Sequence, residues 1–155
     1  MNAMKIIFLD IDGVLNSDRY DRKKSEADGN IDKSRLPLLK RLIDETDART
    51  VLSSSWREHW EREASEMSDA GKELSLIFLQ AGIKIFDKTS FLSSRKEEIN
   101  HWLSLHPEVE GFVILDDNIF GWGELSDYVI KTNNRNGKGL EEEHIIKAKK
   151  ILCGE

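Results

Sequence analysis

The sequence predicts an α/β protein, built as a three-layer α/β/α sandwich around a mostly parallel, doubly wound sheet. Short apolar runs alternate along the chain with longer stretches of helical spacing, a pattern typical of βα units and parallel sheets. Two of these runs, residues 5–9 (KIIFL) and 112–115 (FVIL), are continuous and contain β-branched residues, as expected for strands that are buried on both faces. Residues 49–52, 83–86 and 128–130 are further candidate strands.

Three helical stretches separate these candidate strands. The first is expected to have Ser34 as its N-cap and Pro37 in its first turn, because both residue types favour these positions. Residues 56–80 are charged but largely helical in pattern, with an interruption expected at Gly71. The apolar spacing of residues 95–105 indicates a third helix.

A fourth helix is expected to begin near Leu140. Glu141, Glu142 and Glu143 fall in its first turn and lysines follow toward its end, which is the charge order that complements a helix dipole. We therefore interpret the three glutamates as a helix start rather than as a metal site.

Length and composition indicate one domain. At 155 residues the chain can build a single sizeable core, so we expect one domain over residues 1–155 with a short polar flap at about residues 16–30. Hydrophobic residues make up 39% of the chain and charged residues 34%, which is the balance of a folded protein in water. No apolar run approaches the roughly 20 residues of a membrane helix, and no export signal is recognisable at the N-terminus. We therefore expect a cytoplasmic protein without membrane contacts.

The net charge argues against a general nucleic-acid-binding surface. The chain has 23 basic and 29 acidic residues and a formal charge of −6, so it lacks the overall positive field that attracts a phosphate backbone. A local basic patch remains compatible with this balance. Cys153 is the only cysteine, which excludes an intramolecular disulfide and a zinc site built on several thiolates and is consistent with a reducing cytoplasm.

Polar side chains follow three of the predicted strands at the point where each strand ends. In a parallel sheet the carboxyl ends of the strands lie at one edge, and ligands bind in the crevice outside that edge. We therefore expect residues that are far apart in the sequence to share one site, namely Asp10 and Asp12, Ser53 and Ser54, and Asp116 and Asp117.

Such a cluster of carboxylates requires a cation. Two carboxylates about 4 Å apart repel each other by roughly 4 kcal/mol at an effective dielectric constant near 20, and an anionic substrate would add to this repulsion. A divalent cation that prefers oxygen ligands removes the problem. Mg²⁺ is the expected cofactor because it is commonly held by one or two carboxylates, water and a phosphate oxygen.

Residues 8–15 (FLDIDGVL) resemble the first motif of haloacid-dehalogenase-like (HAD) phosphatases, a hydrophobic strand followed by D-x-D-G and an aliphatic pair. The resemblance implies that Asp10 is the nucleophile that forms an aspartyl-phosphate and that Asp12 is the general acid and base. It also implies that Asp10 and Asp12 contact the metal, Asp12 through its backbone carbonyl. Gly13 would let the chain turn sharply beside the phosphate. The acid at position 12 favours a phosphatase over a dehalogenase.

Two further segments resemble later motifs of this superfamily. Leu52-Ser53 fits the strand-terminal serine that holds a phosphoryl oxygen, with Ser54 as an alternative in the next position. Residues 113–117 (VILDD) fit the acidic motif that binds the metal, which implies Asp117 as a direct ligand and Asp116 as a ligand acting directly or through water.

The remaining motif is a basic residue near the start of a later helix, and two neighbouring residues qualify. The residue most common in the superfamily is lysine, which points to Lys96. Small members that resemble the phosphatase domains of RNA-repair proteins carry an arginine before a similar Glu-Ile and Trp-Leu pattern, which points to Arg95. Both residues stay candidates at this point.

The four motifs occur in the expected order between residues 8 and 117. The chain resembles the RNA-repair subgroup in particular, through the segments FLDIDGVLN, LSSSWR, the predicted helix that begins at Arg95, and residues 132–140. Together these resemblances imply a Mg²⁺-dependent phosphomonoester hydrolase of HAD-like Rossmannoid fold with little or no cap domain. Without a large cap, the site is expected to be open and to admit a macromolecular phosphate end, such as that of a nucleic acid or a phosphoprotein, or else to be closed by another subunit. The expected substrate is a small phosphorylated molecule, such as a nucleotide, or a macromolecular phosphate end.

Two residues outside the motifs are candidates for substrate contacts. Arg57 follows the serine motif and could touch a substrate phosphate, with an exposed helix charge as the alternative. Trp122 lies between two glycines shortly after the acidic motif and is the tryptophan best placed to contact substrate.

Two readings from other functional classes remain. A signalling receiver domain also combines a doubly wound sheet with an acidic Mg²⁺ pocket, but it has a contiguous acidic pair after its first strand, whereas here D-x-D-G comes first and Asp-Asp comes late. A catalytically silent phosphate-binding module is the second alternative. The presence of every residue type expected for catalysis favours an enzyme over both.

Overall fold

A computed structural model describes residues 3–17, 31–133 and 139–154 of the chain. These residues form a five-stranded sheet in which every strand pairing is parallel. Most of the predicted flap, residues 18–30, lies outside the described residues. The strands, in the order in which they lie side by side, are β3 (Ile85–Lys88), β2 (Arg49–Leu52), β1 (Met4–Leu9), β4 (Val109–Asp116) and β5 (Val129–Lys131).

The order in which successive strands are added to the sheet reverses its direction at the central strand, β1. The chain proceeds from β1 outward through β2 to β3 and then crosses back to β4 and β5 on the other side of β1. In a doubly wound sheet this reversal leaves a crevice outside the carboxyl ends of the two strands between which it occurs, which is where such folds bind ligands. Here those strands are β1 and β4.

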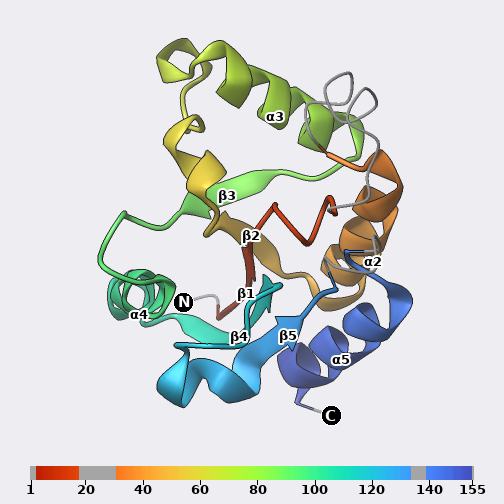
Figure 1. Cartoon of the computed structure of the whole chain (residues 1–155), viewed down its shortest axis with the longest axis vertical. Coiled ribbons are helices and arrows are strands. Elements are labelled where there is room, and N and C mark those ends of the chain that lie inside the picture. Colours follow the sequence, from red (N-terminus) through yellow and green to blue (C-terminus); the bar gives the residue numbers. More distant parts are fainter. Residues whose placement is uncertain (1–2, 18–30, 134–138, 155) are drawn as a thin grey trace.

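Four helices cover the two faces of the sheet, and the three-layer prediction is thereby confirmed. In Figure 1, α2 (Leu36–Thr46) and α5 (Glu142–Cys153) lie on one side and α4 (Arg95–Ser104) on the other. α3 (Asp69–Gln80) contributes to the same core as α2 and α5. None of these helices, within the part of the chain that the structure describes, is long and apolar enough to span a membrane.

Strand β1 is buried on both faces, as its continuous apolar sequence predicts. Ile7 and Leu9 belong to the core beneath α2, α3 and α5, whereas Ile6 and Phe8 belong to the core beneath α4. Phe8 packs edge to face against Trp102 of α4, with ring centroids 5.5 Å apart.

The first helical segment begins differently from the sequence prediction. Ser34 is not an N-cap; its backbone N–H and its hydroxyl both donate to Oδ1 of Asp32, at 3.1 and 2.6 Å. Asp32 therefore caps a short 3₁₀ turn, Lys33–Arg35, and α2 follows with Pro37 in its first turn, as predicted. Aspartate and serine are both strong N-caps, so the composition alone did not decide between positions 32 and 34.

The prediction of one long helix interrupted at Gly71 is wrong. Two 3₁₀ turns, Ser55–Glu58 and Ala64–Glu66, precede α3, whose N-cap Ser68 accepts a hydrogen bond from the backbone N–H of Gly71 at 3.3 Å. Gly71 thus lies inside the first turn of α3. A Cβ atom at this position would overlap the backbone carbonyl of His59, so the glycine is required for close packing rather than for a break.

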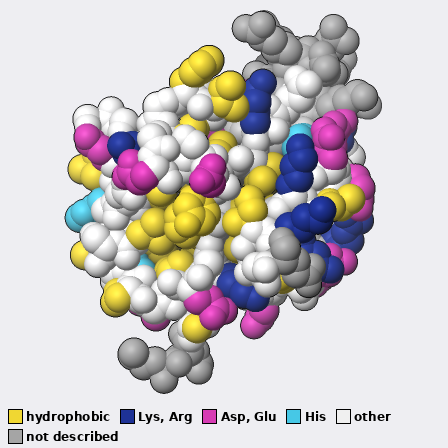
Figure 2. All heavy atoms as spheres, turned by 90° about the horizontal axis from the view of Figure 1, so that it is seen from below, with side chains coloured by type: hydrophobic (Ala, Val, Ile, Leu, Met, Phe, Trp, Pro, Cys, Tyr) yellow, Lys and Arg dark blue, Asp and Glu magenta, His cyan; other side chains and the backbone are white. Residues whose placement is uncertain are grey.

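The glutamate run lies at the start of α5, as predicted, although Glu141, Glu143 and His144 also offer ligand atoms that lie within 4.8 Å of one another, so the run is not excluded as a metal site. Glu141 is the N-cap, Glu142 and Glu143 lie in the first turn, and the backbone N–H of Glu141 donates to Nδ1 of His144 at 2.9 Å in a reciprocal cap. Figure 2 shows that Lys and Arg side chains on the lower face of the molecule gather mainly on the right, the side of α2 and α5 in Figure 1, whereas hydrophobic side chains gather nearer the centre.

Candidate active site

Three carboxylates from the ends of two neighbouring strands converge at the crevice beside β1. Asp10 directly follows β1 and Asp116 is the last residue of β4, and the backbone N–H of Asp10 donates to the carbonyl of Leu115 at 3.0 Å. Asp10, Asp116 and Asp117 each offer an oxygen that lies within 4.8 Å of the others. The predicted meeting of the early and late aspartates is therefore present in the fold.

The electrostatics of this cluster favour a bound cation. Burial raises the pKa of Asp10 to about 7, with the neighbouring carboxylate of Asp116 adding to the rise and Arg95 opposing it. Burial likewise raises the pKa of Asp116 to about 6. The protein thus holds two carboxyl groups in surroundings that disfavour their charged forms, a penalty that a divalent cation with oxygen ligands would remove.

Gly13 leaves room for the third carboxylate. Its backbone has a positive φ of 84°, and a Cβ atom at this position would overlap the side chain of Asp117. The carbonyl of Gly13 accepts a 2.6 Å hydrogen bond from the hydroxyl of Thr132, a residue that is 1% exposed and follows β5. The turn after β1 is therefore fixed between the ends of β4 and β5.

Asp12 lies in the same turn, but its carboxylate stands apart from the buried group. The side chain is exposed; one carboxylate oxygen accepts a hydrogen bond from Nδ2 of Asn16 at 3.0 Å, and the other accepts one from Nε1 of Trp56 at 3.3 Å. A carboxylate held in this way is accessible to solvent, a property that a general acid and base requires.

The serines after β2 differ in what their hydroxyl groups do. Ser53 Oγ is buried and has no hydrogen-bond partner, whereas Ser54 Oγ accepts a hydrogen bond from the backbone N–H of Trp56 at 3.2 Å and caps the following 3₁₀ turn. The backbone N–H of Ser53 donates to the carbonyl of Leu9, the residue before Asp10, at 2.9 Å. Of the two candidates, Ser53 thus has the hydroxyl without a hydrogen-bond partner, at the end of the strand that neighbours β1.

The two basic candidates point in different directions. Arg95 Nη1 lies 3.8 Å from Oδ1 of Asp10 and is buried without a hydrogen-bond partner. Lys96 instead forms an ion pair of 2.9 Å with Glu124. Consecutive residues of a helix are separated by about 100° around its axis, so only one of them can face the carboxylates. The geometry favours Arg95.

Arg57 is not the exposed helix charge that the sequence allowed. Its side chain is buried and forms a 2.6 Å ion pair with Glu98 of α4, so its guanidinium is not free to reach an incoming phosphate. Burial lowers the pKa of Arg57, and the Glu98 carboxylate opposes this effect.

Trp122 is also buried, and the expectation that it contacts substrate is not supported. Its indole belongs to the core beneath α4 together with Phe8 and Leu125, and its Nε1 donates to the carbonyl of Asn118 at 2.7 Å. Its place between two glycines after the acidic motif made Trp122 a candidate for a substrate contact, but the indole packs in the core instead.

Four residues with a part in the site's geometry were not predicted: Asn16 and Trp56, which hold Asp12; Thr132, which anchors Gly13; and Glu98, the partner of Arg57. Asn16 and Trp56 lie within the conspicuous FLDIDGVLN and LSSSWR segments, which was the available signal. For Glu98 the available signal was the Glu-Ile pattern after Arg95, but that pattern does not show that the carboxylate is buried against Arg57.

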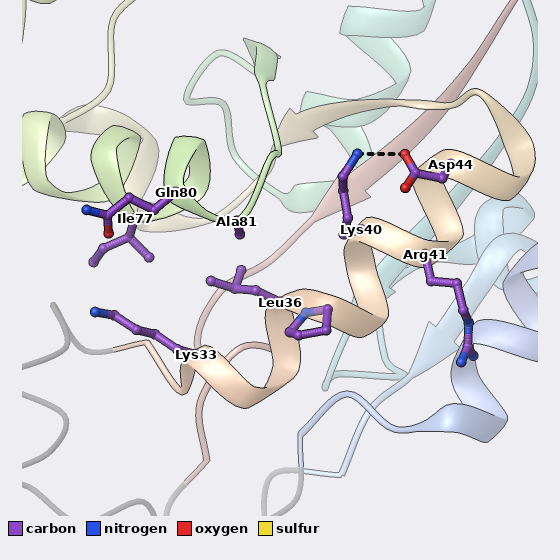
Figure 3. A pocket seen from close by; sticks show the side chains of 9 residues that line it. Lys33, Leu36, Lys40, Arg41, Asp44, Ile77, Gln80 and Ala81 are labelled. Atoms are coloured by element: carbon purple, nitrogen blue, oxygen red, sulfur yellow. Dashed lines mark hydrogen bonds and ion pairs between the residues drawn. The ribbon is translucent and has the colours of Figure 1, made fainter.

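A cavity of about 490 Å³ lies elsewhere, between α2 and the end of α3 (Figure 3). Leu36 and Ile77 contribute apolar side chains, and Lys40 at its edge is paired with Asp44 at 2.7 Å. It shares no lining residue with the carboxylate cluster. The buried donors and acceptors, rather than the size of a hollow, therefore mark the candidate active site.

The comparisons with known proteins agree with this geometry. No curated protein matches the chain. Residues 6–145 match the family model described as the HAD domain in Swiss Army Knife RNA repair proteins, a span that contains every residue of the site described above. The chain therefore belongs to this family of HAD domains.

Proposed function

We propose that this HAD domain hydrolyses phosphomonoesters with the help of Mg²⁺, through an aspartyl-phosphate on Asp10. The observation that carries the proposal is the combination of three converging carboxylates with two buried groups that have no hydrogen-bond partner, Ser53 Oγ and Arg95 Nη1, the latter 3.8 Å from Asp10. Buried polar groups are nearly always hydrogen-bonded, so unpaired donors beside a carboxylate cluster call for an anionic ligand. A phosphoryl group offers oxygens to both the donors and a cation.

The residues present fit a magnesium ion. Asp10, Asp116 and Asp117 supply only oxygen donors, the ligands that Mg²⁺ prefers, and Gly13 keeps the space for Asp117 free. When bound, Mg²⁺ would stabilise the ionised carboxylates and withdraw charge from the phosphoryl group.

The protein's own residues would carry the reaction in two steps. In the first step, a carboxylate oxygen of Asp10 attacks phosphorus, the bond to the leaving oxygen breaks, and Asp12 donates a proton to that oxygen. In the second step, Asp12 takes a proton from water, the water oxygen attacks phosphorus, and the bond to Asp10 breaks, which releases phosphate and restores the enzyme. Ser53 and Arg95 would hold phosphoryl oxygens in both steps.

The rim of the site supports a substrate with an aromatic base, namely a nucleotide or a nucleic-acid end. Four large apolar side chains on the loops after β3 and β4 are strongly exposed: Phe91 by 57%, Leu92 by 48%, Ile119 by 51% and Phe120 by 77%. Exposed rings beside a phosphate site are suited to stacking on a base. The family's occurrence in RNA repair proteins agrees with this substrate class.

Both phenylalanines are held by residues close to the catalytic groups. The guanidinium of Arg57 lies over the ring of Phe91, with its Cζ atom 3.8 Å from the ring centroid. The backbone N–H of Phe120 donates to the side chain of Asn118, whose own backbone N–H donates to Asp116 at 3.0 Å. A base stacked on these rings would thus stay near the acidic cluster.

The test is a phosphatase assay on 3′- and 5′-phosphorylated oligonucleotides, nucleotides, sugar phosphates and phosphopeptides, with Mg²⁺ or with EDTA. We expect Mg²⁺-dependent phosphate release, highest on base-bearing substrates, and its loss in Asp10→Asn. Asp44→Asn is the matched control, because Asp44 is an exposed carboxylate paired with Lys40 outside the site. Acid quenching should trap a covalent phosphate on the wild type and none on Asp10→Asn.

Three results would contradict the proposal. Undiminished turnover in Asp10→Asn would remove the nucleophile. A chain that binds Mg²⁺ and phosphate but releases phosphate from no ester would be a silent phosphate-binding module, and transient self-phosphorylation without turnover would favour a receiver-like role.

A further inference from the structure

A buried ion pair links two separate parts of the candidate site. Arg57, in the 3₁₀ turn after β2, and Glu98, in α4, are 2% and 4% exposed, and their Nη2 and Oε2 atoms are 2.6 Å apart. Removing two charges from water carries a penalty of several kcal/mol for each ion, which the attraction between them often fails to outweigh. Fold stability alone therefore does not explain why this pair occupies the core.

Arg57 acts on the turn that carries the phosphate-binding serine. Its Nη1 donates to the backbone carbonyl of Ser53 at 2.8 Å and to that of Ser54 at 3.0 Å. These two bonds fix the backbone at the end of β2 and with it the position of the Ser53 hydroxyl. The planar guanidinium can bond both carbonyls through one nitrogen and Glu98 through another, which an ammonium group does not match.

Glu98 acts on the part of the site that α4 contributes. Its Oε2 accepts hydrogen bonds from Arg57 and from the backbone N–H of Leu92, the latter at 2.9 Å. Its Oε1 has no hydrogen-bond partner and lies 3.9 Å from Nε of Arg95, one helical turn earlier. Glu98 thus attracts the inner nitrogen of Arg95 and leaves Nη1, which is 3.8 Å from Asp10, for a phosphoryl oxygen.

We propose that Arg57 and Glu98 are positioning residues, which hold Ser53 and Arg95 at the separation that one phosphoryl group can bridge. The proposal rests on the phosphatase function proposed above. Neither residue touches the substrate. Arg57 acts through the backbone carbonyls of Ser53 and Ser54, and Glu98 acts through the guanidinium of Arg95. The Ser53 hydroxyl and the Arg95 guanidinium then face the phosphorus attached to Asp10 without rearrangement.

The decisive variant replaces the pair by apolar side chains of similar size, Arg57→Met with Glu98→Leu. Because such replacements of buried ion pairs are often neutral or stabilising, the variant is expected to fold with a Tm close to that of the wild type. Its kcat should fall about 100-fold, the scale of loss expected when reacting groups are misplaced by about 1 Å. KM should change less than threefold, because the contacts to the leaving group are untouched.

The matched control is Arg41→Met with Glu142→Leu. This pair also joins two helices, α2 and α5, with 2.5 Å between Nη2 and Oε2, but it is exposed and lies outside the site. Its removal should leave kcat and KM at wild-type values.

Two single variants keep the proposal testable if the double variant does not fold. Glu98→Gln preserves size and one acceptor oxygen but removes the charge that faces Arg95 and Arg57. We expect kcat to fall about tenfold, and Tm to fall as well, because Arg57 then stays buried without its counter-charge. Arg57→Ala leaves a cavity with the shape of a guanidinium, so added guanidinium chloride at low millimolar concentration should restore part of kcat, whereas sodium chloride should not.

The outcomes separate the two proposals. A wild type that releases no phosphate from any ester contradicts the phosphatase function itself. An active wild type combined with a folded double variant of equal kcat would show that the pair is only structural. Equal responses of Arg57→Ala to guanidinium and to sodium would overturn the positioning role in the same way.

Discussion

Gly13 and Asp117 lie so close together that no side chain can replace the hydrogen of Gly13 without moving the Asp117 carboxylate. The contact joins the turn after β1 to the turn after β4, across the crevice where the order of strands reverses. The two motifs are thus in contact in the fold, and the glycine of D-x-D-G leaves room for the second aspartate of Asp-Asp.

Gly13→Ala should therefore weaken Mg²⁺ binding. The new methyl group displaces Asp117 and strains a backbone with φ of 84°, for which about 1 kcal/mol of stability is expected to be lost. We expect the Mg²⁺ concentration for half-maximal activity to rise about tenfold or more, which corresponds to about 1.4 kcal/mol of binding energy. Titration of activity and of thermal stability with Mg²⁺ measures both effects.

The control for this variant is Gly154→Ala. Gly154 has a similar φ of 69°, but no atom lies within 4 Å of a Cβ placed on it. It should lose stability through strain alone and keep the wild-type Mg²⁺ dependence. A Gly13→Ala protein that differs from wild type only as much as Gly154→Ala does would show that Asp117 is not a ligand.

Arg95→Ala and Lys96→Ala should differ strongly in activity. Nη1 of Arg95 lies 3.8 Å from Asp10 and has no hydrogen-bond partner, whereas Lys96 pairs with Glu124. Loss of a charged donor to the transition state typically lowers kcat by about 100-fold or more, so we expect that for Arg95→Ala and less than a twofold change for Lys96→Ala. Steady-state kinetics on one oligonucleotide substrate decide the matter, and the reverse ranking would assign the role to Lys96.

These residues show where sequence reasoning reached its limit. The meeting of Asp10 with Asp116 and Asp117 was predictable, because parallel strands present their carboxyl ends at one edge and continuous apolar runs identify buried strands. The choice between Arg95 and Lys96 was not, because it depends on the rotation of α4 against the sheet. That rotation is set by packing, such as the contact of Trp102 with Phe8, which no local pattern encodes.

The burial of Arg57 and Trp122 could not be predicted from the sequence for a related reason. Arg57 is stable in the core only because Glu98, 41 residues away in the sequence, meets it there. Trp122 fills a space in the core that exists only once β1, β4 and α4 are assembled. Side chains whose environment is made by distant residues cannot be placed by composition or periodicity.

In the absence of Mg²⁺, fold stability should decrease as the pH rises from about 4 to 8. The folded-state pKa values of Asp10 and Asp116 are raised by burial, to about 7 and about 6, above the 3.8 of an unperturbed aspartate. The folded chain therefore binds more protons than the unfolded chain in this range, so stability is fully present below the unfolded value and is lost as pH rises through the folded values. Each carboxyl group contributes at most about 1.4 kcal/mol per pH unit.

Thermal unfolding in EDTA at several pH values measures this dependence. Asp10→Asn should flatten it, because the amide does not titrate, and saturating Mg²⁺ should restore most of the stability of the wild type at pH 8. A wild-type Tm that rises with pH relative to that of Asp10→Asn would contradict the assignment of a raised pKa to Asp10.

Phe120→Ala should change which esters are hydrolysed rather than how fast phosphate is transferred. The side chain is 77% exposed, so its removal should hardly affect stability, and its backbone stays tied to Asn118. Stacking on one base contributes about 1–3 kcal/mol, so kcat/KM for nucleotides and oligonucleotide ends should fall by about 5- to 100-fold. Hydrolysis of glycerol phosphate, which has no ring, should be unchanged.

Leu79→Ala is a suitable control, because Leu79 is a 60% exposed apolar residue of α3, remote in the sequence from the loops around the site. It should leave both substrates unaffected. If Phe120→Ala lowers the hydrolysis of glycerol phosphate and nucleotides equally, the ring supports the Asp116 turn rather than the substrate. If it lowers neither, base recognition lies elsewhere on the rim. Phe91, which packs against Arg57 with one face of its ring, is then the residue to substitute next.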